Sequence, residues 1–203
     1  MITTLADQRP NLQAFQSGAV ADVKTQTGLG LHIRPARPDD EAALDAFFRC
    51  VTPEDLRFRF LTGLRVVGHD RLSAMTRIDD PGTIGFLAYN IDNDSIVAAG
   101  MLAADGVGPC PEVALSVSAT MKRHGISWCL LKHMLGHAKA NGLKCVESIE
   151  SAAHKAAIDL EREMGFESLP CPGDPSLRIE RYTFDQGCGK HPVTNAPAAT
   201  SVG

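Results

Sequence analysis

Residues 112–131 read EVALSVSATMKRHGISWCLL, and their pattern is the most informative one in the chain. Apolar and polar residues alternate as far as Val117, with the period of two that is typical of a strand. From Gly125 onward the apolar residues follow the spacing of an amphipathic helix, which we expect to end near Asn141. The stretch therefore predicts a strand that leads through a short loop into a helix.

The loop between these two elements is basic, with Lys122, Arg123 and His124 directly before Gly125. The first amides of a helix have no partners within the helix and carry a partial positive charge. Basic side chains beside them predict a binding site for a small anion such as a phosphate. The alternative reading, which would hold for the basic run seen alone, is a solvated turn.

The composition narrows the class of protein. The chain has 203 residues, of which 44% are hydrophobic, and this suffices for one domain with a substantial core. A net charge of -4 argues against general nucleic-acid binding, which needs a broad basic surface. The six cysteines form no CxxC pair, and no apolar run approaches the roughly 20 residues of a membrane span. We expect a reduced, cytoplasmic protein that binds neither nucleic acid nor membrane.

The pattern along the chain predicts three parts. Residues 1–30 and 186–203 have little periodicity and are expected to be flexible segments, so that the domain covers residues 31–185. Within the domain, Ile91-Asp-Asn-Asp predicts a hairpin turn, and Thr52 before Pro53 predicts a helix start. The expected strands are 31–34, 83–90, 95–103, 112–117, 144–149 and 176–184, and the expected helices are 38–49, a stretch from Thr52, 70–78, 125–141 and 152–164. This order predicts a mixed α/β (α+β) fold.

Three sequence features carry a resemblance to a known family. The run Lys122-x-x-Gly125-x-Ser127 resembles the acetyl-CoA-binding motif of the GNAT N-acetyltransferases. That motif has Gln or Arg, then two residues, Gly, one further residue, and Gly or Ala. Gly165-Phe166 is similar to the family's ending of the helix before the final strand. The stretches 32–40 and 52–60 are similar to the GNAT domains of bacterial protein lysine acetyltransferases. The resemblance spans about Leu31 to Phe184.

The resemblance implies a central mixed sheet of about six or seven strands flanked by helices, and acetyl-CoA as co-substrate without a metal. It places the pantetheine arm along the strand that contains Leu115 and Val117, and the pyrophosphate on the following loop. A histidine, His154, stands where many members carry an asparagine that contacts the cofactor. The implied cofactor-binding residues are Leu115, Val117, Lys122, Arg123, His124, Gly125, Ile126, Ser127 and His154. Ser127 departs from the usual Gly or Ala, and its hydroxyl either crowds the phosphate or donates a hydrogen bond to it.

Transfer of an acetyl group to an amine requires a base. A free lysine has a pKa near 10.4, so only about one amine in 10³ is neutral at pH 7. The resemblance identifies Glu112 with the strand glutamate proposed as general base in the protein lysine acetyltransferases, and its apolar neighbours are expected to desolvate it. A backbone amide near Val117 would stabilise the oxyanion. The alternative for Glu112 is a surface salt bridge at the end of a strand.

Other parts of the family's machinery differ in this chain. Glu161 stands where many members carry a tyrosine that protonates the departing thiolate, and solvent or His124 would supply that proton instead. His133 and His137 have the spacing of metal ligands, but no third ligand lies nearby in the sequence, so no metal is expected. The aromatic residues Phe47, Phe48, Phe58 and Phe60 are expected in the core, and Arg57, Arg59 and Arg65 in solvent.

The sequence therefore predicts an N-acetyltransferase that uses acetyl-CoA, with a protein lysine as the first choice of acceptor. A small amine is the alternative acceptor, and an acyl-CoA sensor without catalytic activity is the alternative class. Both a monomer and a homodimer remain open, because no heptad pattern or long apolar edge decides between them.

Overall fold

We describe the fold from a computed structural model, which describes residues 10–13, 19–104 and 108–184. The helices of the described residues occur in two groups along the chain, one between the second and third strands and the other after the fifth strand. They are β1 (Ala21–Lys24), β2 (Gly30–Pro35), the 3-10 helix η1 (Pro38–Asp40), α1 (Glu41–Phe48), α2 (Pro53–Phe60), α3 (His69–Thr76), β3 (Thr83–Asn90), β4 (Ser95–Ala103), β5 (Glu112–Val117), the 3-10 helix η2 (Ala119–Met121), α4 (Ile126–Ala140), β6 (Cys145–Ser151), α5 (Lys155–Glu163), β7 (Glu167–Pro170) and β8 (Leu177–Thr183).

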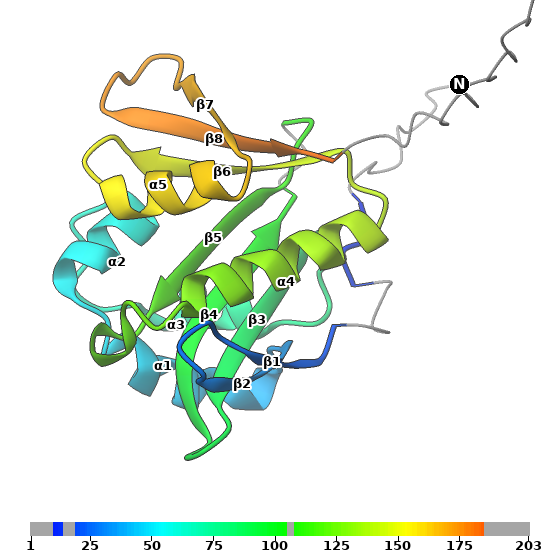
Figure 1. The fold of residues 1–203 in the computed structure, drawn as a ribbon, viewed down its shortest axis with the longest axis vertical. Helices are drawn as coiled ribbons and strands as arrows, with labels where there is room; N and C mark the ends of the chain where they lie inside the picture. Colours follow the sequence, from blue (N-terminus) through cyan, green and yellow to red (C-terminus); the bar gives the residue numbers. More distant parts are fainter. Residues whose placement is uncertain (1–9, 14–18, 105–107, 185–203) are drawn as a thin grey trace, which may run out of the picture.

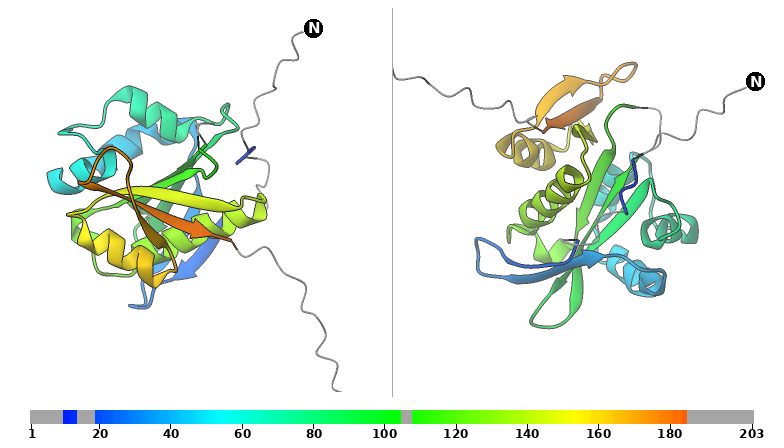
Figure 2. Two further views of the ribbon diagram at one scale, coloured as in Figure 1. Left: turned by 90° about the horizontal axis from the view of Figure 1, so that it is seen from above. Right: turned by 90° about the vertical axis from the view of Figure 1, so that its right-hand side faces the viewer.

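The strands form a single mixed sheet in the order β1-β2-β3-β4-β5-β6-β8-β7. Neighbouring strands are antiparallel except for β5 and β6, which are parallel. Helix α4 packs on one face, against β4 and β5, whereas α1 and α3 pack on the other (Figure 1). Helix α5 lies on the same side as α4 (Figure 2). This arrangement confirms the predicted mixed α/β fold, with eight strands in the described residues instead of six or seven.

Each face of the sheet has its own hydrophobic core. Phe86 belongs to the core under α4 and its neighbour Leu87 to the core under α1 and α3, because successive residues of a strand face opposite sides. Helix α4 approaches the sheet closely at Gly100, where an added Cβ would lie 2.6 Å from the sulfur of Met134. A larger residue at this position would therefore require the Met134 side chain to move.

Strands β5 and β6 separate almost as soon as they meet. Their one paired position joins Glu112 to Glu147, and the Glu147 amide donates to the Pro111 carbonyl at 2.9 Å. A disulfide between Cys110 and Cys145 ties the two strands at this same end. Beyond it, the edge of β5 that faces β6 has no strand partner among the described residues (Figure 1).

The cysteine chemistry corrects one expectation. The sequence predicted reduced cysteines throughout, but the sulfurs of Cys110 and Cys145 are bonded, 35 residues apart in the chain. Cysteines at the ends of two different strands give no local spacing signal, so only the strand pairing reveals their proximity. Three other described cysteines are free, namely Cys50, Cys129 and Cys171.

The N-terminal segment is also more ordered than predicted. Residues 1–30 were expected to be flexible, yet β1 lies within them and pairs with β2. Leu12 is fully buried, and its carbonyl lies 2.7 Å from Nε2 of His137, while that of Ala19 lies 3.1 Å from Nε2 of His133. These two histidines bind the N-terminal segment, and no cluster of metal-ligating side chains exists among the described residues. Residues 1–9 and 14–18 of the predicted N-terminal segment and the tail 186–203 lie outside the described residues.

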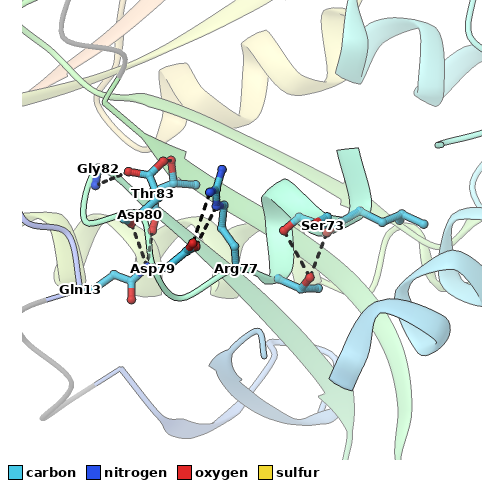
Figure 3. A network of polar contacts seen from close by, with 9 residues as sticks. Gln13, Ser73, Arg77, Asp79, Asp80, Gly82 and Thr83 are labelled. Atoms are coloured by element: carbon cyan, nitrogen blue, oxygen red, sulfur yellow. Dashed lines mark hydrogen bonds and ion pairs between the residues drawn. The ribbon is translucent and has the colours of Figure 1, made fainter. Parts of the chain in front are cut away.

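A polar network holds the chain ahead of β3 (Figure 3). The side-chain amide of Gln13 donates to the backbone carbonyls of Asp80 and Thr83, both at 2.9 Å, so the N-terminal segment is fixed to this loop. The Asp80 carboxylate accepts from the Gly82 amide and the Thr83 hydroxyl, each at 3.0 Å, and shapes the turn into the strand.

Strand β7 was not predicted from the sequence, and the remaining elements agree closely with their prediction. Asn90 and Ser95 flank the predicted hairpin turn, and the Thr52 hydroxyl accepts from the Asp55 amide at the start of α2. Helix α4 ends at Ala140, next to the predicted stop. None of the helices in the described part of the chain has the length and apolar character needed to cross a membrane.

Candidate active site

A cavity of about 860 Å³ lies where β5 and β6 separate. Its walls are β5, the end of β6, helix α2, and the first turns of α4 and α5. The two strands diverge here, so their backbones do not pair, and the cavity lies in the space between them. The size is that of a site for a cofactor or another small molecule.

Strand β5 forms one wall with an unpaired edge. Leu115 and Val117 pack partly against the core under α4, whereas Glu112 at the start of the strand is exposed. The Ser116 hydroxyl is buried and has no hydrogen-bond partner among the described residues. The free backbone groups of this edge can bind an extended ligand as an added strand.

The loop before α4 forms the second wall. Arg123 and Gly125 have positive φ angles of 66° and 76°, and Gly125 is the N-cap of the helix. The first amides of α4, from Ile126 and Ser127, stand beside the cavity and have no partners within the helix. Such a helix start can bind an anion.

Two neighbouring elements fix this loop. The hydroxyl of Thr27, in the turn between β1 and β2, donates to the His124 carbonyl at 3.1 Å. The Lys122 ammonium lies 2.6 Å from a carboxylate oxygen of Asp55 on α2, so part of its charge is already balanced. The sequence did not indicate either contact, because both join distant parts of the chain.

The cavity brings together nearly all of the residues predicted to form the site. Its lining includes Glu112, Leu115, Val117, Lys122, Arg123, Gly125, Ile126, Ser127 and His154. His124 does not line it; its Nδ1 lies 2.9 Å from the Lys122 carbonyl and its side chain is exposed. The expected desolvation of Glu112 is wrong, because its side chain is exposed at the end of the strand.

His154 is held in place on two sides. Its Nδ1 lies 2.7 Å from Oε2 of Glu150, which is four residues earlier in strand β6. The ring of Phe58 from α2 stacks on the imidazole at a centroid distance of 4.3 Å. Phe58 was expected in the core and lines the cavity instead. Glu150 was not identified from the sequence, where only its spacing of four from His154 gives a signal.

Arg59 is another residue that the sequence placed in solvent. In the structure it is half-buried and lines the cavity, and its guanidinium lies 5.1 Å from the centre of the Phe60 ring. Burial lowers the pKa of Arg59, and the charges of Glu112 and Glu150 raise it. Glu112 of β5 and Glu150 of β6 therefore both interact electrostatically with Arg59.

Glu161 is the most unusual group in the lining. Its side chain is only 5% exposed, and the Ser148 hydroxyl donates to its Oε1 at 2.7 Å. Burial, together with the charge of Glu150, raises the pKa of Glu161 to about 8. At pH 7 the group is therefore a neutral carboxylic acid. The sequence placed Glu161 where many family members carry a tyrosine, but it did not indicate that the Glu161 side chain is buried.

Comparisons with known proteins agree with this geometry. The model of the acetyltransferase (GNAT) family matches residues 47–166. An acetyltransferase of Pseudomonas aeruginosa is 27% identical over 155 residues, which cover 75% of this chain and 83% of that protein.

Solved structures share the fold. The GNAT domain of PAT from S. lividans has a TM-score of 0.75 at 19% identity, over 83% of this chain and 98% of that domain. A GNAT-family acetyltransferase from Streptococcus pneumoniae has a TM-score of 0.60 at 18% identity, over 76% of this chain and 99% of that one. With the family model matching more than half of its length, this chain belongs to the GNAT family of acetyltransferases.

Proposed function

We propose that the chain transfers an acetyl group from acetyl-CoA to an amine, with the amine of a protein lysine as acceptor. The observation that carries this proposal is the unpaired edge of β5, which leads along one cavity directly to the start of α4. An extended amide-bearing arm that ends in phosphates needs these two features in this order.

The residues present fit acetyl-CoA. The backbone of Val113 to Val117 can pair with the pantetheine amides, and the buried Ser116 hydroxyl is a further group without a partner among the described residues. The amides of Ile126 and Ser127, with Arg123 beside them, can hold the pyrophosphate. The Ser127 hydroxyl can add a hydrogen bond there. When bound, acetyl-CoA supplies an acetyl group that is activated as a thioester.

Glu112 acts as the base in this proposal. It stands where β5 and β6 begin to separate and lines the cavity, where an acceptor amine can approach it directly or through a water molecule. Arg59 lies in the same region and favours the ionised form of nearby carboxylates. A backbone amide of β5 near Val117 stabilises the negative charge that develops on the acetyl oxygen.

The choice of a protein lysine rests on the similarity of residues 32–40 and 52–60 to protein lysine acetyltransferases. The charge of the cavity suits both a protein lysine and the alternative of a small cationic amine. Glu112 and Glu150 both lie close to Arg59, so this part of the cavity carries one positive and two negative charges. The net charge of these three groups is -1, which attracts the ammonium group of a protein lysine or of a small amine.

The test begins with calorimetric titration of acetyl-CoA, for which micromolar binding corresponds to about -8 kcal/mol. Glu112→Gln should then retain the cofactor affinity and lose acetyl transfer to lysine peptides. A panel of small amines, assayed beside the peptides, identifies the acceptor class. Binding without transfer to any amine, and without an effect of Glu112→Gln, would favour the acyl-CoA sensor. An absence of binding at millimolar acetyl-CoA would refute the proposal.

A further inference from the structure

Arg59 presents a positive charge to the cavity without a direct partner. It lies on α2 and lines the cavity, and its side chain is half-buried. Among the described residues its guanidinium has neither a hydrogen bond nor an ion pair, and the charges of Glu112 and Glu150 act on it from a distance. Its nitrogen atoms are not among the fully buried polar atoms that lack a partner, so they are accessible. Because both glutamates line the cavity, the guanidinium lies on the cavity side of α2.

A guanidinium in this position favours an anionic ligand. Burial of a charge costs free energy unless a partner of opposite charge or a hydrogen-bond acceptor offsets it. The N–H donors of an arginine match the two oxygens of a carboxylate, with which they form two parallel hydrogen bonds. Arg59 therefore has the donors for a carboxylate, and the described residues leave these donors unused.

A second arginine strengthens this positive wall. Arg71 on α3 also lines the cavity, and its guanidinium lies 5.4 Å from the centre of the Phe60 ring, against 5.1 Å for that of Arg59. The Arg71 guanidinium likewise has no hydrogen bond or ion pair in the described part of the chain, and its side chain is exposed. Two like charges beside one ring repel each other, and an anion bound next to them relieves this repulsion.

The two arginines lie at the end of the cavity where the acceptor is expected. Glu112, which acts on the charge of Arg59, is at the start of β5, whereas the loop proposed for the pyrophosphate follows the end of that strand. The cavity here has acidic groups on the strands and basic groups on helices α2 and α3. An acceptor that carries both an ammonium and a carboxylate matches this pattern of charges.

We propose that Arg59, with Arg71 beside it, binds a carboxylate of the acceptor, so that the acceptor lysine has an acidic residue next to it in its protein. This inference rests on the proposed function, because it takes the ligand at this end of the cavity to be an amine. Arg59 determines specificity in this role: its guanidinium holds the carboxylate while the lysine amine faces Glu112. The α-carboxylate of a free amino acid has the same chemistry, so the experiment includes both sources.

The first measurement uses the wild-type protein with acetyl-CoA and two peptides. Each peptide has blocked ends and one lysine, which is flanked on both sides by glutamate in one peptide and by glutamine in the other. We expect kcat/KM to be about 10-fold higher for the glutamate peptide, which corresponds to about 1.4 kcal/mol. A second pair of acceptors, L-lysine and 1,5-diaminopentane, offers the same side-chain amine with and without an α-carboxylate.

The outcomes separate the two sources of the carboxylate and the two proposals. A preference confined to L-lysine over 1,5-diaminopentane would support the carboxylate site and assign it to a free amino acid. Measurable transfer without a preference in either pair would overturn the inference and leave the proposed function intact. No transfer to any of the four acceptors would overturn the proposed function, and this inference with it.

Variants then assign the preference to Arg59. Arg57 provides a matched control, because it lies on the same helix with its guanidinium 5.4 Å from the centre of the Phe58 ring, yet it does not line the cavity. Arg59→Gln should abolish the preference found in the wild type, whereas Arg57→Gln should keep it. The calorimetric Kd for acetyl-CoA should be unchanged in both variants. Weaker binding of acetyl-CoA by Arg59→Gln would assign the guanidinium to the cofactor and overturn the inference.

The preference also separates direct binding of a carboxylate from an indirect role. If Arg59 only maintained the fold or the ionisation of Glu112, Arg59→Gln would lower kcat/KM by the same factor for both peptides, and the inference would be wrong. Arg71→Gln changes an exposed side chain, so it should reduce the preference without a loss of stability in thermal unfolding. Should Arg59→Gln fail to fold, Arg71→Gln decides, and an unchanged preference in that variant would overturn the inference.

Discussion

Replacing Glu161 with glutamine should make the protein more stable than the wild type, and increasingly so as the pH rises. Glu161 has a pKa of about 8 in the folded chain, against a reference value of 4.5. Below pH 4.5 the group is protonated in both the folded and the unfolded state and contributes no difference. Between the two values only the unfolded state releases its proton, so the wild type loses stability as the pH rises.

The magnitude follows from the two pKa values. One pKa unit corresponds to about 1.4 kcal/mol, so the full separation sets an upper limit of about 5 kcal/mol above pH 8. At pH 5 the linkage relation gives a loss of about 1 kcal/mol, and at pH 7.5 a loss of about 4 kcal/mol. The difference in free energy of unfolding between Glu161→Gln and wild type should therefore grow by about 3 kcal/mol across this interval.

The assay is urea unfolding of both proteins at a series of pH values between 5 and 8. Glu163→Gln, an exposed change on the same helix, controls for the lost charge and should show only a small dependence on pH. A constant difference between Glu161→Gln and wild type from pH 5 to pH 7.5 would refute the reasoning. It would mean that Glu161 is ionised in the folded protein throughout.

Three further changes test the fold and the site. Gly125→Ala places a Cβ at a φ of +76°, 3.5 Å from that of Thr25, and should cost about 1 kcal/mol in stability and weaken acetyl-CoA binding measured by calorimetry; unchanged affinity would argue against the loop as the anion site. Replacing Cys110 and Cys145 together by serine opens a link of 35 residues and should lower the free energy of unfolding by about 4 kcal/mol in denaturant titrations, whereas equal stability would indicate that the bond is absent in solution. Leu12→Ala should cost about 2 to 5 kcal/mol in the same assay, and a neutral result would show that the N-terminal segment is not packed against the core.

The sequence predicted the elements that bury an apolar face and missed those that do not. Helix α4 has seven buried residues on one stripe, and the period of that stripe is visible in the sequence. Strand β1 has no buried residue, and β7 is mostly exposed and ends at Pro170. A short edge strand of this kind has no periodic signal, because its backbone pairing alone holds it in the sheet.

The candidate site likewise has one part that the sequence predicted and one part that it did not. The half that is proposed to bind the cofactor lies on one continuous stretch, from Glu112 to Ser127, so a motif could predict nearly all of it. Its other half combines Arg59 from α2 with Glu150 from β6 and Glu161 from α5. No spacing in the sequence reports that these elements converge, and the protonation of Glu161 depends on neighbours from two strands.

The parting of β5 from β6 has a consequence for solubility. An unpaired strand edge normally invites strands of other chains to add to it, which leads to aggregation. Here the open edge is in the interior of the sheet, with α4 and α5 on one side and α2 on the other (Figure 1). These helices cover both faces of the sheet beside the open edge, so a strand of another chain has less access to it than to an edge at the margin of the sheet. The edge can therefore stay unpaired without the usual tendency to aggregate.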